Sequence, residues 1–364
     1  PLHKKTGTGL QSTDAEVLES LANQHKVVDS IIAIRKLGKI KNTYVDNLLW
    51  NLDSDGKVRT GFNLTSTTSG RLSSSGKFNM QQIPRDSPFI KGSIRGTGKY
   101  EGWKVISQDL KTGEVYVAAV LSGDKNLQEV FKSGGDFHST IAKGVFLLPC
   151  PVDDVKKYFK DKRQGAKAVT FSILYGAGAR KVSDTVSKES EEGFSVEDAQ
   201  DAIDAYFRAY PKLKKWLKNT ENLIKQQGFI YHSFGRKRRL KNVHSVDKGI
   251  AAHEVRSGVN CVVQGLCSDL NLLAAIDMQA YIEKTKLQAE IFALVHDSIV
   301  GLVHPDAVEE YCTKLAEFTQ KDRGFSIPGC PIGIDQEVGD DYSFGKFTKE
   351  VGEQYQEFLD AKAS

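Results

Sequence analysis

One predicted helix, from about Asp154 to Tyr175, constrains the chain more than any other segment. It carries Arg163, Lys167, Phe171 and Tyr175 at intervals of four residues. Each such step turns about 40° further around a helix axis, so the first three side chains lie on one stripe. Two cations beside an aromatic ring suit a nucleoside triphosphate, because Arg and Lys both bind phosphate oxygens. Taken alone, the stripe fits an ordinary amphipathic helix, with two solvated cations and two core aromatic residues, better than a nucleotide site.

Length and composition predict a globular chain with two or three subdomains. The chain has 364 residues, which is too long for one compact core. Because 40% of the residues are hydrophobic and 26% are charged, the chain is too apolar to be disordered. No run of 18 or more apolar residues predicts a membrane span, and the first residues lack a signal-peptide pattern. Because the chain does not begin with Met, we expect a processed chain or a fragment. The cysteines form no C-x-x-C pair, which favours reduced intracellular thiols over a zinc site: Cys150, Cys261, Cys267, Cys312 and Cys330.

Positive charge is concentrated in one part of the chain. The formal net charge is only +4, but residues 211–248 hold eleven Lys and Arg against Glu221 and Asp247. The densest part of this segment runs from Arg236 to Lys241. Such a stretch in a nearly neutral protein indicates either a track for a polyanion or a solvated charged face.

Two predicted strands end at an aspartate. The strand Lys104–Leu110 ends at Asp109, and the hairpin Ile291–Val303 carries Asp297 at its tip, in the sequence His-Asp-Ser. Apolar hairpins usually turn through Asn-Gly or Asp-Gly, so this turn predicts a function. If the two strand ends converge on one sheet edge, the carboxylates can hold two Mg²⁺ ions about 3.5–4 Å apart. One ion would activate a hydroxyl and the other would stabilise a leaving pyrophosphate, which is phosphoryl-transfer chemistry.

A polar, glycine-rich loop is predicted at residues 68–76. It carries Arg71 and is followed by Asn79 and Gln82. Amides grouped beside an Arg can bond sugar and base edges, although ordinary turn chemistry is the commoner reason for such a composition.

A long helix is predicted from about His253 to Tyr281. On this mostly apolar segment, Arg256, Asn260 and Gln264 recur at i+4 spacing. Polar side chains on a buried helix need partners, and a nucleic-acid backbone or minor groove would provide them.

The other segments predict a mixed α and β chain. Helices are expected before residue 50 and over most of 124–228, and short strands at 58–64 and 228–231, the second returning the chain to the sheet. A helix is expected at residues 113–120, with Glu114 in its first turn, and another helix is expected after Pro305. An acidic tail completes the pattern, with Asp335, Glu337, Asp340 and Asp341.

Taken in order, these motifs resemble the polymerase region of family A DNA polymerases, the bacterial polymerase I type, in a divergent phage-like form. The resemblance covers almost the whole chain, and it rests on eight motifs in family order. They are Gly70-Arg71-Leu72-Ser73-Ser74, Gln82-Ile83-Pro84, Asp109 with Glu114, Ser122-x-Asp124-Lys125, Asp136-x-His138, the helix from Arg163 to Gly176, Gln264-Gly265 and Val295-His296-Asp297.

The resemblance implies a right-hand α+β fold with an antiparallel palm sheet, helical fingers and the helical base of a thumb. The expected division is thumb base at 1–50, palm at 51–130 and 229–364, and fingers at 131–228. It also implies template-directed DNA synthesis, in which a primer 3′-OH is extended with deoxynucleoside triphosphates and pyrophosphate is released.

The resemblance implies a role for each site residue. Asp109 and Asp297 would be catalytic and would bind metal together with the Leu110 carbonyl, the cofactor being two Mg²⁺ ions, with Mn²⁺ as a substitute. Glu114 would exclude a ribose 2′-OH. The other implied nucleotide contacts are His138, Arg163, Lys167, Phe171 and Tyr175. The implied DNA contacts are Arg71, Asn79, Gln82, Arg256, Asn260, Gln264 and His296, and we add Arg236 from the basic run.

Two departures keep other functions open. Asp109 is followed by Leu-Lys-Thr-Gly instead of the usual Tyr-Ser-Gln, and Ser298 replaces the usual third acid. His-Asp-Ser also occurs in single-subunit RNA polymerases, which are the alternative enzyme, and a catalytically inactive nucleic-acid clamp is the alternative of another class. Expected partners are primer-template DNA, deoxynucleotides and a separate exonuclease or processivity partner, but no membrane. The expected location is the cytoplasm of a bacterial or phage-infected cell, or alternatively an organelle.

Overall fold

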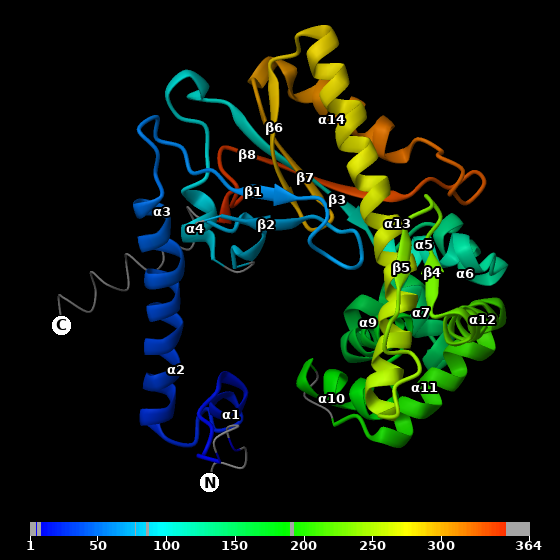
Figure 1. Ribbon diagram of the computed structural model, residues 1–364. Coiled ribbons are helices and arrows are strands. Elements are labelled where there is room, and N and C mark those ends of the chain that lie inside the picture. Colours follow the sequence, from blue (N-terminus) through cyan, green and yellow to red (C-terminus); the bar gives the residue numbers. More distant parts are fainter. Residues whose placement is uncertain (1–4, 6–8, 77, 85–86, 190–192, 347–364) are drawn as a thin grey trace.

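The computed structural model describes residues 5, 9–76, 78–84, 87–189 and 193–346. At its centre lies a four-stranded antiparallel sheet with the order β6-β7-β3-β8 (Figure 1). The strands are β3 (Lys104–Lys111), β6 (Ala289–Val295), β7 (Ser298–Val303) and β8 (Gly333–Gly339). This sheet, with helices on one side of it and a helical arm on the other, confirms the expected right-hand α+β class.

The palm sheet is covered on both faces. On one face, Ile106 and Ile299 pack against Met278 of α13 (Lys248–Thr285) and Tyr311 of α14 (Val308–Gln320). On the other face, the palm sheet packs against the segment before β3, which includes η2 (Met80–Gln82) and α4 (Pro88–Gly92). The strands therefore cannot slip in register without exposing one apolar face.

Helix α13 joins the two large parts of the molecule, running from the finger helices to the back of the palm (Figure 1). By length and composition alone it could cross a membrane, but 72% of its most apolar segment is buried inside the protein. Apolar residues around most of its circumference are what a central core helix needs.

The helices beside the sheet form a second core. Buried side chains from α5 (Gly113–Ser122), α9 (Lys160–Leu174), α12 (Pro211–Gln227) and α13 meet in one cluster. The remaining helices of this part are α6 (Lys125–Lys132), α7 (Phe137–Phe146), α8 (Val152–Tyr158), α10 (Ala179–Glu189) and α11 (Val196–Ala209).

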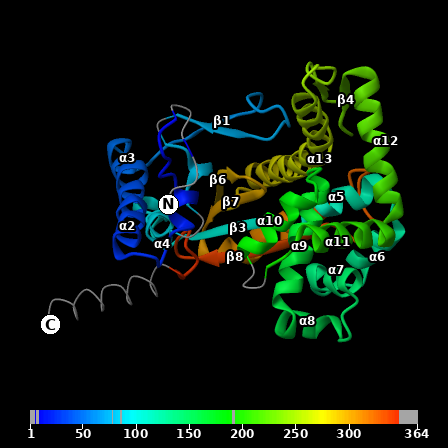
Figure 2. The ribbon, with the colours of Figure 1, turned by 90° about the horizontal axis from the view of Figure 1, so that it is seen from below.

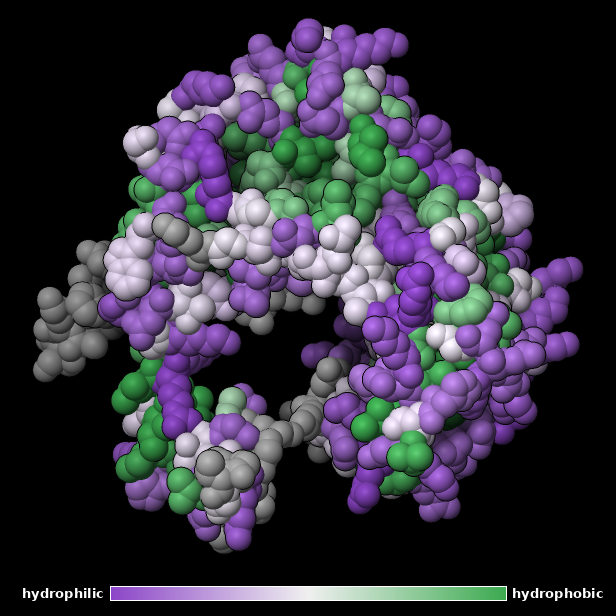
Figure 3. Space-filling view, viewed as in Figure 1, coloured by the Kyte–Doolittle hydropathy of each residue, from purple (hydrophilic) through white to green (hydrophobic). Residues whose placement is uncertain are grey.

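The N-terminal helices stand apart from the fingers. After the short α1 (Ala15–Glu19), the helix α2 (Lys26–Lys39) continues through the π-helix η1 (Ile40–Val45) into α3 (Asp46–Trp50). Figure 2 shows α2 and α3 on one side of the strands and the fingers on the other, and Figure 3 shows the surface hollowed between them. The palm sheet forms the floor of this hollow, so a large ligand would reach the sheet edge from here.

Four expected elements differ from the structure. The helix expected from Asp154 to Tyr175 is two helices, α8 and α9, because the chain leaves the helical region at Phe159 (φ −132°, ψ 46°). The strand expected at 58–64 is reduced to β1 (Gly61–Asn63), which pairs with β2 (Ser73–Ser75) inside the segment expected to be a loop.

The other two differences concern strand pairing. The segment at 228–231 does form β4 (Phe229–Tyr231), but it pairs with β5 (Lys237–Arg239) in a separate ribbon instead of returning to the palm. The acidic tail was expected without any assigned strand, whereas residues Gly333–Gly339 form the edge strand β8 beside β3.

Gly301 tests the packing of the palm sheet. A Cβ added there would lie 2.7 Å from Cζ of the buried Tyr311 ring. Because the ring is enclosed and cannot move away, we expect Gly301→Ala to lower the free energy of unfolding by about 1–3 kcal/mol, as measured by urea denaturation. The control is Gly144→Ala in α7, where an added Cβ meets nothing within 4 Å. Equal stability of the two variants would contradict this packing.

Candidate active site

The strand register brings the two predicted catalytic acids together at one end of the strands of the palm sheet. Asp109 of β3 lies directly opposite Ser298 of β7, so Asp297, in the turn before Ser298, is its close neighbour. The turn is tight, because His296 takes a left-handed conformation with φ 55°. The Leu110 side chain is buried, and its backbone N–H donates to Oδ1 of Asp109 at 3.0 Å. The expected convergence of Asp109 and Asp297 is therefore present.

Arg71 connects this edge to the fingers. Its Nη2 donates to Oε1 of Glu114 at 2.6 Å and lies 3.4 Å from both carboxylate oxygens of Asp297. Burial disfavours the charge of Arg71, but Asp297 and Glu114 outweigh burial and raise the pKa of the guanidinium. One cation thus fixes the distance between the first turn of α5 and the tip of the β6–β7 hairpin.

Tyr175 completes the same network from the end of α9. Its hydroxyl donates to Oε2 of Glu114, and the side chain of Gln264 from α13 also bonds this hydroxyl. Burial and the carboxylate of Glu114 raise the pKa of Tyr175, so the hydroxyl keeps its proton and remains a donor. Glu114 is itself only 8% exposed, and its two oxygens are held by two different partners.

The stripe on α9 faces the helix α7. Arg163 forms a two-pronged pair with Asp136: its Nε donates to Oδ2, and its Nη2 donates to Oδ1 at 2.7 Å. Asp136 is also the N-cap of α7 and accepts the backbone N–H of Ser139. A fork-to-fork pair fixes the plane of the guanidinium as well as its position.

His138 lies in the first turn of α7, beside the stripe. Its ring centroid is 6.0 Å from that of Phe171. Burial and the positive charge of Arg163 lower the pKa of His138 to about 4, and Lys167 adds to this effect. The imidazole is therefore neutral at pH 7, and it can donate one hydrogen bond without adding a charge. The structure thus brings the predicted nucleotide contacts Arg163, Lys167, Phe171 and His138 together.

The polar stripe on α13 lines a separate small cavity. Arg256, Asn260 and Gln264 face Tyr175 and the loop residues Thr68 and Ser69 across about 350 Å³. Helix α9 can approach because residue 176 is glycine: a Cβ there would lie 2.8 Å from Cγ of Arg256. The cavity lies next to Tyr175 and therefore adjoins the cluster around Glu114.

Three predicted DNA contacts lie outside this group. Asn79 uses both ends of its amide inside the protein, accepting from Gln81 N at 3.0 Å and donating to Ser74 O at 3.2 Å. Gln82 is exposed in η2. Arg236 pairs with Asp269 of α13 at 2.9 Å.

Several side chains of the basic run contact other residues of the protein, which the composition of the run did not indicate. Besides Arg236, Arg238 donates to Ser257 Oγ at 3.3 Å, and Lys237 lies over the Phe229 ring at 3.8 Å. Since β5 begins within the run, these side chains alternate between the two faces of the β4–β5 ribbon.

The structure adds two acids that the sequence reasoning did not assign to the site. Asp136 was recognised only as part of a motif, and its pairing with Arg163 across 27 residues has no local signal. Asp335 was placed in an acidic tail, but it lies on β8 directly opposite Asp109, and Lys111 lies 3.8 Å from it. The available signal for that strand was the apolar residues Ile332, Ile334 and Val338 at even positions.

Comparisons with known proteins agree with this geometry. The model of the family "DNA polymerase family A" matches residues 1–343. The DNA polymerase of Escherichia phage T5 is 48% identical over 96% of this chain and 43% of its own length. The thermostable DNA polymerase I of Thermus aquaticus is 33% identical over 94% of this chain and 39% of its own length. This chain therefore spans about two fifths of these curated relatives.

A solved structure is also similar. The POL domain of Pol1 from M. smegmatis, in complex with DNA primer-template and dNTP, superposes with a TM-score of 0.82 and 27% identity. The match covers 94% of this chain and 58% of that one.

The Asp136–Arg163 pair predicts a pH dependence. Hydrogen bonds from Arg163, opposed by partial burial, lower the pKa of Asp136, so the pair stabilises the fold above the pKa of the unfolded chain and is lost as the pH falls. Because the Asp136 side chain is 35% exposed, we expect Asp136→Asn, which retains the cap, to lose about 0.5–1 kcal/mol at pH 7. The difference from wild type in urea denaturation should shrink below about pH 4.

Arg163→Gln provides the matched control for this pair. It should show the same pH dependence, and the double variant should lose little more than either single variant. A stability difference that is independent of pH would mean that Asp136 acts only through the α7 cap.

Proposed function

The chain belongs to DNA polymerase family A, and from this membership we propose that it catalyses template-directed extension of a primer with deoxynucleoside triphosphates. The observation that supports this most directly is the meeting of Asp109, Asp297 and the Arg71–Glu114–Tyr175 network at one sheet edge beside the cationic stripe. In the proposed reaction, the primer 3′-oxygen bonds to the α-phosphorus while the bond to the pyrophosphate breaks.

The donor set at the sheet edge fits Mg²⁺. Among the described residues, no group of three or more His, Cys, Asp or Glu forms a metal cage. Mg²⁺ is commonly held through one or two carboxylates and the substrate phosphates instead of an all-protein cage. Asp109 and Asp297 would hold the ions, and bound Mg²⁺ would neutralise charge on the attacking and leaving oxygens.

The stripe on α9 is suited to the triphosphate. Arg163 is held in one orientation by Asp136, and Lys167 is exposed beside it. We propose that these two cations and the neutral His138 bind the β- and γ-phosphates, while Phe171 contacts the sugar. Fixed donors around the leaving phosphates favour the transition state because they need no rearrangement as charge develops.

Glu114 is proposed to select the sugar. Because Tyr175 and Arg71 each hold one oxygen, the carboxylate cannot rotate away to make room for a 2′-hydroxyl. A rigid wall next to C2′ would leave deoxynucleotides unaffected and penalise ribonucleotides.

The DNA is proposed to lie in the hollow between the N-terminal helices and the fingers. Arg256, Asn260 and Gln264 would face the templating base next to Tyr175, with Arg71 and His296 near the primer end. The bound primer-template and dNTP of the structurally similar M. smegmatis domain support these partners.

Primer extension with Mg²⁺ tests the proposal directly, with deoxynucleotides and ribonucleotides in parallel reactions. We expect pyrophosphate-releasing addition of the templated deoxynucleotide. A preference for ribonucleotides would favour the RNA polymerase alternative, and DNA binding without addition would favour an inactive clamp.

Asp109→Ala and Asp297→Ala should each abolish nucleotide addition but leave primer-template affinity within about threefold. Each substitution removes one of two metal ligands, whereas DNA affinity comes mostly from phosphate contacts elsewhere. Extension rates and DNA binding by fluorescence anisotropy measure the two effects. Asp306→Ala, an exposed acid elsewhere in the palm, is the control and should extend normally. Near-normal turnover in either site variant would show that the metal assignment is wrong.

Glu114→Ala should increase the ratio of kcat/KM for a ribonucleotide to that for its deoxynucleotide by orders of magnitude. Some loss of deoxynucleotide rate should accompany this change, because Arg71 and Tyr175 lose their shared partner. Tyr175→Phe keeps the carboxylate but releases one of its oxygens, so it should change the ratio less. If the ratio stays within about twofold of wild type in Glu114→Ala, Glu114 only adds a favourable negative charge near the N-terminus of α5, an effect worth under about 1 kcal/mol.

A further inference from the structure

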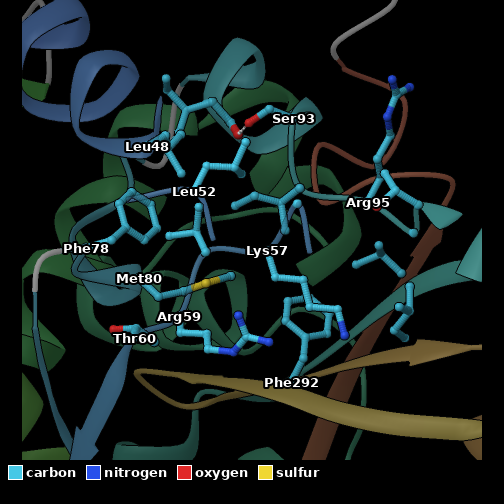
Figure 4. A pocket seen from close by; sticks show the side chains of 18 of the residues that line it. Leu48, Leu52, Lys57, Arg59, Thr60, Phe78, Met80, Ser93, Arg95 and Phe292 are labelled. Atoms are coloured by element: carbon cyan, nitrogen blue, oxygen red, sulfur yellow. Dashed lines mark hydrogen bonds between the residues drawn. The ribbon is translucent and has the colours of Figure 1, made fainter. Parts of the chain in front are cut away.

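The loop that carries Arg71 joins β1 to β2, and this hairpin is not part of the palm sheet. The base of the hairpin borders a cavity of about 640 Å³ between α3, α4 and the palm sheet. Figure 4 shows Thr60, directly before β1, and Phe78 and Met80, which follow β2, at the wall of this cavity. Packing at the base is therefore open on one side, so contacts at the far end of the hairpin must help to fix the β1–β2 loop.

Helix α13 supports the far end of this loop with a row of residues at i+4 spacing. Cys261, Gly265 and Asp269 lie on one face of α13. The Cys261 thiol donates to the carbonyl oxygen of Thr68 at 3.5 Å. At Gly265, an added Cβ would lie 2.7 Å from the carbonyl oxygen of Ser69. The loop backbone thus rests directly on the helix at the position where the helix has no side chain.

Arg236 closes over the loop from the turn of the β4–β5 ribbon. Its Nη2 donates to Oδ1 of Asp269 at 2.9 Å, and its guanidinium lies against Gly70. A Cβ added at Gly70 would overlap Nη1 and Cζ of Arg236, and this glycine also has a positive φ of 83°. The residue directly before Arg71 is therefore enclosed by a guanidinium that an ion pair with α13 holds in place.

His232 contacts the second oxygen of Asp269. Its Nε2 lies 3.3 Å from Oδ2 of Asp269, and its Nδ1 accepts the backbone N–H of Phe234. Burial lowers the pKa of His232, so the ring is neutral at pH 7 and Arg236 supplies the positive charge that balances Asp269. Because Asp269 is only 9% exposed, leaving its charge unpaired would be strongly destabilising, and the pair holds Arg236 firmly.

We infer that Arg236, held by Asp269, is a positioning residue that fixes the β1–β2 loop and through it Arg71. The inference rests on the proposed function, in which Arg71 holds one oxygen of Glu114 and lies beside Asp297. A displacement of Gly70 would move Arg71 away from both carboxylates. Glu114 would then lose one of the two partners that keep it rigid, and selection against ribonucleotides would weaken.

Arg236→Gln tests this inference by removing the guanidinium. The matched control is Arg239→Gln, which removes the same charge from an exposed position of the same ribbon. We expect Arg236→Gln alone to raise the ratio of kcat/KM for a ribonucleotide to that for its deoxynucleotide by at least about threefold, with a lower kcat for the deoxynucleotide. Primer-template affinity, and its dependence on salt concentration in fluorescence anisotropy, should be the same in both variants.

Hydrogen exchange of the full chain, followed by mass spectrometry, reports on the loop without any turnover. Peptides that cover residues 64–72 should exchange at least about fivefold faster in Arg236→Gln than in wild type or Arg239→Gln. Asp269→Asn keeps the size of the side chain but not its charge, so it should act in the same direction, and the double variant should add little. Because this measurement needs no nucleotide, failure of the proposed polymerase reaction would leave it interpretable.

A reciprocal pair of variants tests the contact from the loop side. Gly70 and Gly76 both have a positive φ, 83° and 100°, so alanine introduces backbone strain at either position. A Cβ at Gly76 would lie 3.7 Å from the backbone N of Gly61, an ordinary contact, whereas a Cβ at Gly70 would displace Arg236. We expect Gly70→Ala to raise the ribonucleotide ratio and Gly76→Ala to leave it unchanged.

Three results would overturn the inference. Unchanged exchange of residues 64–72 in Arg236→Gln would show that Arg236 does not hold the loop. Faster exchange with a ribonucleotide ratio equal to that of Arg239→Gln would show that the loop does not control Glu114. Weaker primer-template binding with a salt slope reduced by about one, at an unchanged ratio, would assign Arg236 to a DNA phosphate, the contact expected from the sequence.

Discussion

The ion pair of Arg71 with Glu114 and Asp297 is the constraint on which the rest of the site depends. Arg71 comes from the loop before the palm sheet, Glu114 from the helix α5 that follows β3, and Asp297 from a hairpin near the end of the chain. A largely buried cation needs compensating carboxylates, because an unpaired charge in such a place is strongly destabilising. The three segments therefore hold one another in a single arrangement, and the distance from the proposed metal-binding acids to Glu114, the proposed sugar-selecting carboxylate, follows from it.

Local patterns predicted most of the side chains that the structure brings together in the candidate site. Helical periodicity placed Arg163, Lys167 and Phe171 on one face, and strand ends predicted Asp109 and Asp297, because side-chain direction follows from chain geometry alone. Sequence periodicity carries no information about which distant group a side chain meets. The Asp136–Arg163 pair and the opposition of Asp335 to Asp109 depend on how helices and strands pack, so neither was predicted.

The same distinction explains the errors in the expected fold and the pairing found within the basic run. The break at Phe159 has neither Pro nor Gly to signal it, and the β4–β5 ribbon is set by pairing partners that periodicity does not reveal. The composition of the basic run indicated either a polyanion track or a solvated charged face, and it did not reveal that Arg236 is paired with Asp269 and Arg238 with Ser257. A count of charges describes a surface only when no acid from another segment neutralises it.

The charges of the active site already have partners within the protein. Arg163 is held by Asp136, and Arg71 by Glu114 and Asp297. A triphosphate would therefore bind partly by exchange, sharing or replacing a carboxylate as the partner of Arg163, so the gain is the difference between two charge-assisted contacts. Metal at Asp297 would likewise compete with Arg71 for the same oxygens. Such pre-pairing lowers nucleotide affinity but keeps each group in position, and it favours a ligand that supplies phosphates and metal together.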